Sequence, residues 1–265
     1  MIKENKHPEI TLIIFMLMIL FYNIAFTQEK PNIIFIMADD LGYGDVGVYG
    51  QQLIKTPNID RLSAQGIRFS NYYSGAAVCA PARSVLMTGL HTGHTRIRGN
   101  FGKGGVVGLA GKQGRVPIKE EDLTIAEFLQ ENGYRTGMIG KWGLGTPDNI
   151  SNPNDIGFDH FFGYVDMWHA HNFYPEFLIR NGEVQQLRNE VAPRWKSFQE
   201  PGRPQAGRGV AIKRVDYAPD LFIAEVEKFI RDSHREPFFL FHSLNTPHAN
   251  NEAGSKGMEV SDLGE

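Results

Sequence analysis

Long apolar segments predict the strands of this chain. Asn32–Ala38 and Pro237–Leu244 are strand-length segments dominated by apolar side chains, without the polar alternation of a half-exposed strand. Segments of this kind are typical of strands buried on both faces of a parallel sheet. Shorter patterns predict further strands at Ile67–Tyr73 and Tyr134–Ile139.

Helical patterns and their end signals lie between these strands. Thr56-Pro57 predicts a helix start, because threonine is a favoured N-cap and proline fits the first helical position, and Gly66 predicts its end. Further helices are predicted over Pro81–Met87, Thr124–Asn132 and Asp216–Asp232. Strands that alternate with helices predict an α/β fold with a mainly parallel sheet flanked by helices.

The N-terminal residues have the pattern of a secretory signal peptide. Two lysines precede an apolar run over Ile10–Phe26. We expect residues 1–27 to be cleaved, which leaves residues 28–265 as a periplasmic or secreted domain without a stable membrane span. The alternative is an uncleaved anchor, although the run is short for a span and Asn23 interrupts it.

Composition narrows the class of protein. Hydrophobic residues make up 42% of the chain and charged residues 22%, which is the balance of an ordinary globular protein. The net charge of −3 gives no reason to expect a nucleic-acid partner.

Residues 151–209 have weak periodicity and many proline, asparagine, glutamine and arginine residues. We expect a variable loop segment there, which is the usual place for substrate contacts. Within it, His169 and His171 form a pair that could bind a metal. Because no third ligand is evident, substrate contact is the favoured interpretation.

Polar side chains follow both long apolar strands. Asp39-Asp40 follows the first, and Asn245-Thr246-Pro247-His248 follows the last. Because ligands of open α/β sheets bind outside the carboxyl ends of the strands, we expect both segments to reach one site. Adjacent carboxylates suit Ca²⁺ or Mg²⁺, whereas a helix cap with a solvated turn is the alternative for an isolated pair.

Cys79 is the only cysteine of the chain. In an exported protein a lone cysteine indicates an intermolecular bridge, a buried thiol or a functional residue. Cys79 precedes the helix predicted at Pro81, and a helix N-terminus favours an anion. Arg83 lies one helical turn further on the same side. The alternative is a buried thiol beside an arginine that pairs elsewhere.

The segment Cys79-x-Pro81-x-Arg83 resembles the signature of the type I sulfatases, which belong to the alkaline phosphatase superfamily. The segments "PNIIFIMADDLGYGDVGVYG", "TPNIDRLSAQGIRFSNYY", "GYRTGMIGKWGLG" and "TPHAN" resemble the same family in the same order. The resemblance implies an alkaline-phosphatase-like fold. It also implies that residues 28–265 are the N-terminal portion of the catalytic domain, with the C-terminal part of that domain missing.

The resemblance implies a formylglycine-dependent sulfuric ester hydrolase. A formylglycine-generating maturation enzyme would oxidise Cys79 to an aldehyde, which is then hydrated to a diol. One hydroxyl attacks sulfur and displaces the alcohol, and the second then loses its proton so that the aldehyde re-forms and sulfate is expelled. The expected substrates are aryl or carbohydrate sulfate esters, as a sulfated small molecule or glycan.

The resemblance also implies residue roles. Asp39, Asp40 and the modified Cys79 would hold one Ca²⁺ ion, which offsets charge on the transferring group. Arg83 would hold the diol.

Lys141 would contact both the sulfate and the diol. His248 would hydrogen-bond the sulfate or help the leaving oxygen depart. Gly143 stands where many members of the family carry a histidine, so one diol contact must come from elsewhere or from water.

Two alternatives remain open at this point. Relatives with the same modified residue hydrolyse phosphodiesters or phosphonate esters. The chain could also be a catalytically inactive fragment, because two carboxylates are too few for the 6–8 oxygen ligands of Ca²⁺. A truncated sheet would also expose strand edges and apolar faces.

Overall fold

The computed structural model describes Glu9, Phe15, Met16 and residues 30–100, 116–145, 152–200 and 206–261. Apart from those first three residues, the predicted signal peptide over 1–27 lies outside this part of the chain. No helix among the described residues is both long and apolar enough to cross a membrane. The chain from Ile33 onward forms one compact unit.

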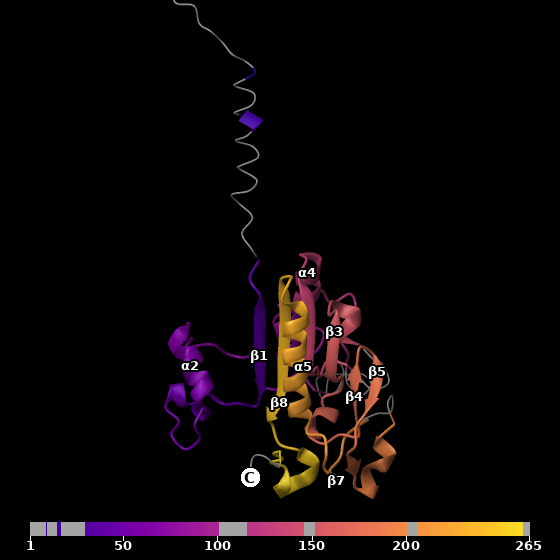
Figure 1. The fold of residues 1–265 in the computed structure, drawn as a ribbon. Coiled ribbons are helices and arrows are strands. Elements are labelled where there is room, and N and C mark those ends of the chain that lie inside the picture. The colour runs from indigo at the N-terminus through magenta and orange to yellow at the C-terminus, as the bar shows by residue number, and fades with distance from the viewer. Residues whose placement is uncertain are drawn as a thin grey trace, which may run out of the picture. The chain divides into compact units, whose positions relative to one another are not determined.

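A six-stranded sheet organises this unit, in the order β1-β8-β2-β3-β4-β5 (Figure 1). The first four strands in that order are parallel, and β4 and β5 are antiparallel additions. This arrangement confirms the mainly parallel sheet predicted from the sequence. The strands are β1 (Ile33–Asp39), β2 (Arg135–Lys141), β3 (His160–Tyr164), β4 (Phe177–Arg180), β5 (Glu183–Gln186) and β8 (Phe238–Pro247).

Helices pack on both faces of the sheet because successive strand residues point to opposite sides. Phe239 and Phe241 of β8 join a core cluster with residues of α3 and α4, whereas Phe238 and Leu240 join a second cluster with α5. In Figure 1, α5 runs along the sheet beside β8. The α/β prediction is therefore confirmed. The helices are α2 (Pro57–Gln65), α3 (Cys79–Thr88), α4 (Ile125–Glu131) and α5 (Ala218–Ser233).

Short elements complete the described structure. A separate two-stranded antiparallel sheet consists of β6 (Glu190–Val191) and β7 (Ala211–Lys213). The 3-10 helices are η1 (Tyr43–Asp45), η2 (Gly47–Tyr49), η3 (Pro153–Ile156), η4 (His169–His171), η5 (Pro193–Phe198) and η6 (Asn251–Lys256).

Strand β1 is buried on one face only, which corrects the prediction of a fully buried strand. It lies at the edge of the sheet and pairs with β8. Phe35 packs against Phe241 in the core, with ring centroids 5.9 Å apart. On the opposite face Ile34 and Ile36 are 48% and 58% exposed among the described residues, whereas α5 contacts β2, β3 and β8.

Two further predictions are wrong. Ile67–Tyr73 forms no strand, and its large side chains are exposed, with Ile67 at 84% and Tyr73 at 82%. The segment 151–209 is not a set of loops, since β3, β4 and β5 extend the main sheet within it. These strands have five or four residues each, which is too short to give a clear sequence period.

Candidate active site

The carboxyl ends of β1, β8 and β2 meet at one edge of the sheet. A register shift after Met37 places Asp39 beside Pro247, next to His248. On the other side of β8, Gly140 pairs with Ser243, so Lys141 also emerges at this edge. The expectation that widely separated segments deliver polar side chains to one edge is therefore met.

Cys79 is the first residue of α3, two residues earlier than the predicted helix start. Asn100 stabilises this end, because its Oδ1 accepts a hydrogen bond of 3.0 Å from the backbone N–H of Ala80. The thiol is partly exposed and its Sγ lies 3.4 Å from Nζ of Lys141. The helix therefore presents this side chain to the ammonium group at the end of β2.

Arg83 is fully buried, and its side chain hydrogen-bonds residues of β2, β8 and β1. Its Nη1 donates to the backbone oxygen of Lys141 at 2.7 Å and also to Oγ of Ser243. Its Nη2 donates to Oδ1 of Asp39 at 3.3 Å. The planar guanidinium reaches these acceptors through two separate nitrogen atoms held in a fixed geometry.

Asp39 is neutralised from two sides. Its Oδ2 accepts from Nζ of Lys141 at 2.5 Å, and its Oδ1 accepts from Arg83. Burial raises the pKa of this carboxyl, but the charges of Lys141 and Arg83 outweigh burial and hold the pKa below its ordinary value. Asp39 is therefore a carboxylate at neutral pH.

His248 completes the group around the thiol. Its Nδ1 lies 2.7 Å from the backbone oxygen of Ala249, which leaves Nε2 to face Cys79 and to approach Oδ2 of Asp40 at 3.5 Å. The interaction with Cys79 raises the pKa of His248 and outweighs burial. Burial raises the pKa of the Cys79 thiol, but His248 and Lys141 outweigh it, so the net pKa is lowered.

The two histidines of the H-x-H segment occupy different environments. His171 stacks on His248, with ring centroids 4.6 Å apart and an angle of 14° between the planes. His169 instead packs in the interior against Tyr164 and Phe177, and burial lowers its pKa to about 3. The structure therefore brings His171 to the site and leaves His169 out of it.

The described residues offer part of a cation site. Ligand atoms of Asp39, Cys79 and His248 lie within 4.8 Å of one another. Asp40 adds a carboxylate that is 62% exposed, on a backbone with φ of +64°. Carboxylate oxygens are donors that Ca²⁺ accepts, so Asp39 and Asp40 fit this ion, although they supply only some of the 6–8 oxygens that it takes.

Two residues of this region were missed at the sequence level. Ser243 lies within the apolar pattern of β8, and its Oγ links Arg83 to the backbone of Lys141. Glu252 lies in η6, and its carboxylate is 3.6 Å from Nδ1 of His171. The polar pair His242-Ser243 after four apolar residues of β8 was the one signal for Ser243, whereas no sequence pattern pointed to Glu252.

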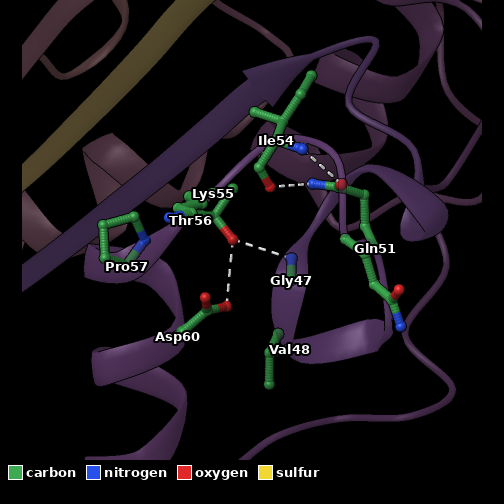
Figure 2. A pocket seen from close by; sticks show the side chains of 9 residues that line it. Gly47, Val48, Gln51, Ile54, Lys55, Thr56, Pro57 and Asp60 are labelled. Carbon is green, nitrogen blue, oxygen red and sulfur yellow. Dashed lines mark hydrogen bonds between the residues drawn. The ribbon is translucent and has the colours of Figure 1, made fainter.

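A cavity of about 370 Å³ lies elsewhere, beside the start of α2 (Figure 2). Its polar groups are paired with one another: the N–H of Gly47 donates to Oγ1 of Thr56, which donates to Oδ1 of Asp60. None of the catalytic, metal-binding or substrate-binding candidates from the sequence lines it. We therefore assign no chemistry to this cavity.

Comparison with known protein families identifies the family of this chain. The family model described as Sulfatase matches residues 31–258. The chain belongs to the sulfatase family. That span includes Asp39, Cys79, Lys141 and His248, and it confirms the resemblance noted in the sequence.

Individual sulfatase relatives cover most of this chain. Arylsulfatase A of Homo sapiens is 33% identical over 89% of this chain and 45% of the relative. The solved structure of Ps i-CgsB aligns with 32% identity and a TM-score of 0.62, over 83% of this chain and 46% of the other. A solved complex with the substrate D-glucosamine-2-N,6-O-disulfate aligns with 27% identity and a TM-score of 0.59, over 83% and 35%.

These likenesses confirm the alkaline-phosphatase-like fold of the sulfatase. The chain spans less than half the length of the curated relatives that it matches.

Proposed function

We propose that this sulfatase is a sulfuric ester hydrolase that removes sulfate from aryl or carbohydrate sulfate esters. The observation that carries the proposal is the surrounding of Cys79, whose Sγ lies 3.4 Å from Nζ of Lys141 and faces His248. Cationic donors around a nucleophile stabilise the charge that develops on a transferred sulfuryl group. Membership in the sulfatase family supports the same reaction.

The nucleophile of the proposal is a hydroxyl of formylglycine hydrate, formed from Cys79 by a formylglycine-generating maturation enzyme. The partly exposed position of Cys79 at the start of α3 supports access to this side chain. Nζ of Lys141 would donate to a sulfate oxygen and to the hydrated side chain. Arg83 would orient that side chain through its buried Nε, which has no hydrogen-bond partner among the described residues.

His248 is the proposed proton donor to the leaving oxygen. In the unmodified chain the interaction with Cys79 raises the pKa of His248 above its ordinary value. Its Nδ1 is taken up by the backbone oxygen of Ala249, so Nε2 is the atom available to position 79. Proton transfer to the departing oxygen matters most for leaving groups that are poor as anions. We therefore expect His248 to matter more for the hydrolysis of carbohydrate esters than for that of activated aryl esters.

One Ca²⁺ ion is proposed at Asp39 and Asp40, where it would offset negative charge on the sulfate and on the hydrated side chain. These two carboxylates supply only some of the 6–8 oxygens that Ca²⁺ takes. The substrate contact predicted for His169 is not proposed, because this ring packs in the interior. His171 is proposed to act through the His248 ring, on which it stacks.

A sulfated sugar or aryl ester is the proposed substrate class, in the periplasm or outside the cell. The complex of a structural relative with D-glucosamine-2-N,6-O-disulfate supports the carbohydrate class. The basic and apolar N-terminal segment supports export with cleavage after residue 27.

Paired assays after maturation test the proposal. The chain would be produced together with the formylglycine-generating enzyme, and the peptide containing position 79 would be weighed by mass spectrometry to confirm the aldehyde. Hydrolysis would then be measured in Ca²⁺ for 4-nitrophenyl sulfate and for bis(4-nitrophenyl) phosphate. We expect turnover of the sulfate ester, with none in the matched Cys79→Ala control.

Each other outcome identifies an alternative. Turnover of the phosphate diester without the sulfate would make the protein a phosphodiesterase. An aldehyde at position 79 with no turnover of either ester would mean that the 265 residues alone are inactive.

A further inference from the structure

The imidazole ring of His171 packs against the face of the His248 ring. The His171 and His248 rings are stacked nearly parallel, at 4.6 Å and 14°. Their side chains are 8% and 10% exposed, so the stack is largely closed to water. The other contacts of His248 lie at the edge of its ring: Nδ1 with the Ala249 oxygen, and Nε2 toward Cys79 and Asp40.

The carboxylate of Glu252 lies within ion-pair distance of His171. Its Oε2 lies 3.6 Å from Nδ1 of His171, and its side chain is 8% exposed. Its backbone N–H donates to Oδ1 of Asn250 at 3.1 Å, so η6 is anchored at the same point. Burial raises the pKa of Glu252, but His171 and Arg208 outweigh burial and keep it a carboxylate.

Arg208 contacts the other carboxylate oxygen of Glu252. Its Nε lies 3.5 Å from Oε1 of Glu252. The guanidinium lies over the rings of Trp195 and Phe198, with its central carbon 4.8 Å and 5.2 Å from the ring centroids. A guanidinium packed on aromatic faces is both attracted and restricted in its movement. Glu252 therefore lies against a guanidinium that is packed on aromatic rings, and not against a freely solvated side chain.

We propose that His171 and Glu252 are positioning residues that fix the His248 ring so that its Nε2 faces residue 79. The geometric part of this inference stands on the contacts above, and its consequence for the reaction rests on the proposed sulfatase function. A ring attached by two rotatable bonds needs such packing to stay in one orientation. Without the His171 face, the ring would keep only contacts at its edge, with Ala249, Cys79 and Asp40, and these leave it free to tilt.

The stack also explains how His171 differs from a substrate ligand. Its ring face is covered by His248 and its Nδ1 is turned toward Glu252. Loss of a substrate ligand would raise KM, whereas loss of a positioning residue lowers kcat, because the ground-state contacts of the substrate are unchanged.

The first test is spectroscopic and needs neither maturation nor turnover. In the 265-residue chain labelled with ¹⁵N-histidine, imidazole spectra would be compared for the unchanged chain and for Glu252→Gln. We expect the ring resonances of both His171 and His248 to move. The matched control is Glu225→Gln, which breaks another buried Glu–His pair, 2.8 Å from His160, and which should move His160 but not His248.

The second test separates ring positioning from general support of the fold. In the matured enzyme, His171→Ala and Glu252→Gln should lower kcat for phenyl sulfate by about 10- to 100-fold, with KM nearly unchanged. The loss should be smaller for 4-nitrophenyl sulfate, whose leaving group departs without a proton. His171→Phe keeps a flat ring against His248 and should recover part of the loss.

Two results would overturn the inference. One is an unmoved His248 spectrum in Glu252→Gln, even in a chain that hydrolyses sulfate esters. The other is a kcat loss that does not depend on the leaving group or that also occurs in Glu225→Gln, since either pattern would reduce the role of Glu252 to fold stability. A chain that lacks sulfatase activity would still give the spectroscopic answer, so the failure of the proposed function is distinguishable.

Discussion

Nζ of Lys141 lies 2.5 Å from Oδ2 of Asp39, and the two side chains are 0% and 5% exposed. They come from the ends of β2 and β1, which flank β8 in the sheet. Because Arg83 approaches the other oxygen of Asp39, the site is a closed arrangement of opposite charges before any ligand binds. Such buried charges are costly to separate, and this makes the arrangement testable through stability.

Removal of the Lys141 charge should destabilise the chain in a pH-dependent way. In metal-free buffer with a chelator, we expect Lys141→Met to lower the free energy of unfolding by about 3 kcal/mol at pH 7, because a buried carboxylate loses its main partner. The folded pKa of Asp39 is depressed below its ordinary value of 3.8, so its stabilisation is present above that pH.

The same stabilisation is lost as pH falls through the folded pKa of Asp39. The difference between the two proteins in urea unfolding should therefore shrink below about pH 4. Lys228→Met is the matched control, because Lys228 pairs with Asp232 on the surface and its loss should leave stability nearly unchanged. A difference that stays constant from pH 7 to pH 3 would contradict this explanation.

A methyl group at position 140 should disrupt the sheet beside the site. A Cβ on Gly140 would lie 1.9 Å from the backbone oxygen of Ser243, and φ is +112°. We expect Gly140→Ala to cost at least about 4 kcal/mol or to prevent folding, as measured by urea denaturation.

Gly50 isolates the conformational part of that cost. It has φ of +105°, but a Cβ at this position would meet no heavy atom within 4 Å. Gly50→Ala should therefore cost only about 1–2 kcal/mol. Equal costs at the two positions would mean that the close approach of β2 to β8 is not the decisive factor.

The Cys79 thiol should be unusually reactive before maturation. Its lowered pKa increases the thiolate fraction at neutral pH, and the thiolate is the form that reacts with iodoacetamide. The pH midpoint of alkylation should lie below that of glutathione. His248→Gln should raise the midpoint and slow the reaction at pH 7, whereas a change at the exposed His94 should have no effect. An ordinary midpoint in the unchanged chain would argue against the site geometry.

The two faces of β1 should respond differently to substitution. Ile36→Thr should change the free energy of unfolding by less than about 0.5 kcal/mol, because Ile36 is 58% exposed. Phe35→Ala should cost about 3 kcal/mol, because Phe35 packs against Phe241 in the core. Urea denaturation of the 265-residue chain measures both, and a large cost at Ile36 would show that this face is covered in solution.

Long and regular sequence patterns predicted helices and strands correctly, whereas short patterns did not. The β8 strand and the α5 helix were predicted within a few residues, because each pattern covers several turns or a full strand length. The strands β3 and β4 were missed because five and four residues give too few repeats of a period. The apolar residues of Ile67–Tyr73 satisfied a local strand pattern, but a strand also needs a neighbour for its backbone hydrogen bonds.

The same limit applies to the site. Cys79, Lys141 and His248 were identified from local motifs, because each lies beside a recognisable strand end or helix start. His169 and His171 could not be told apart, since two residues of one short segment share every sequence feature. Only packing turned one ring into the interior and laid the other against His248.

The sequence by itself determined the class of fold, the family and the candidate residues of the site, because apolar periodicity and short motifs are properties of neighbouring residues. Tertiary structure alone decided that Ser243 supports Arg83, that Glu252 reaches His171, and that one face of β1 stays open. These contacts join segments far apart in the chain. Their geometry depends on sheet register and on burial, and neither can be inferred from neighbouring residues alone.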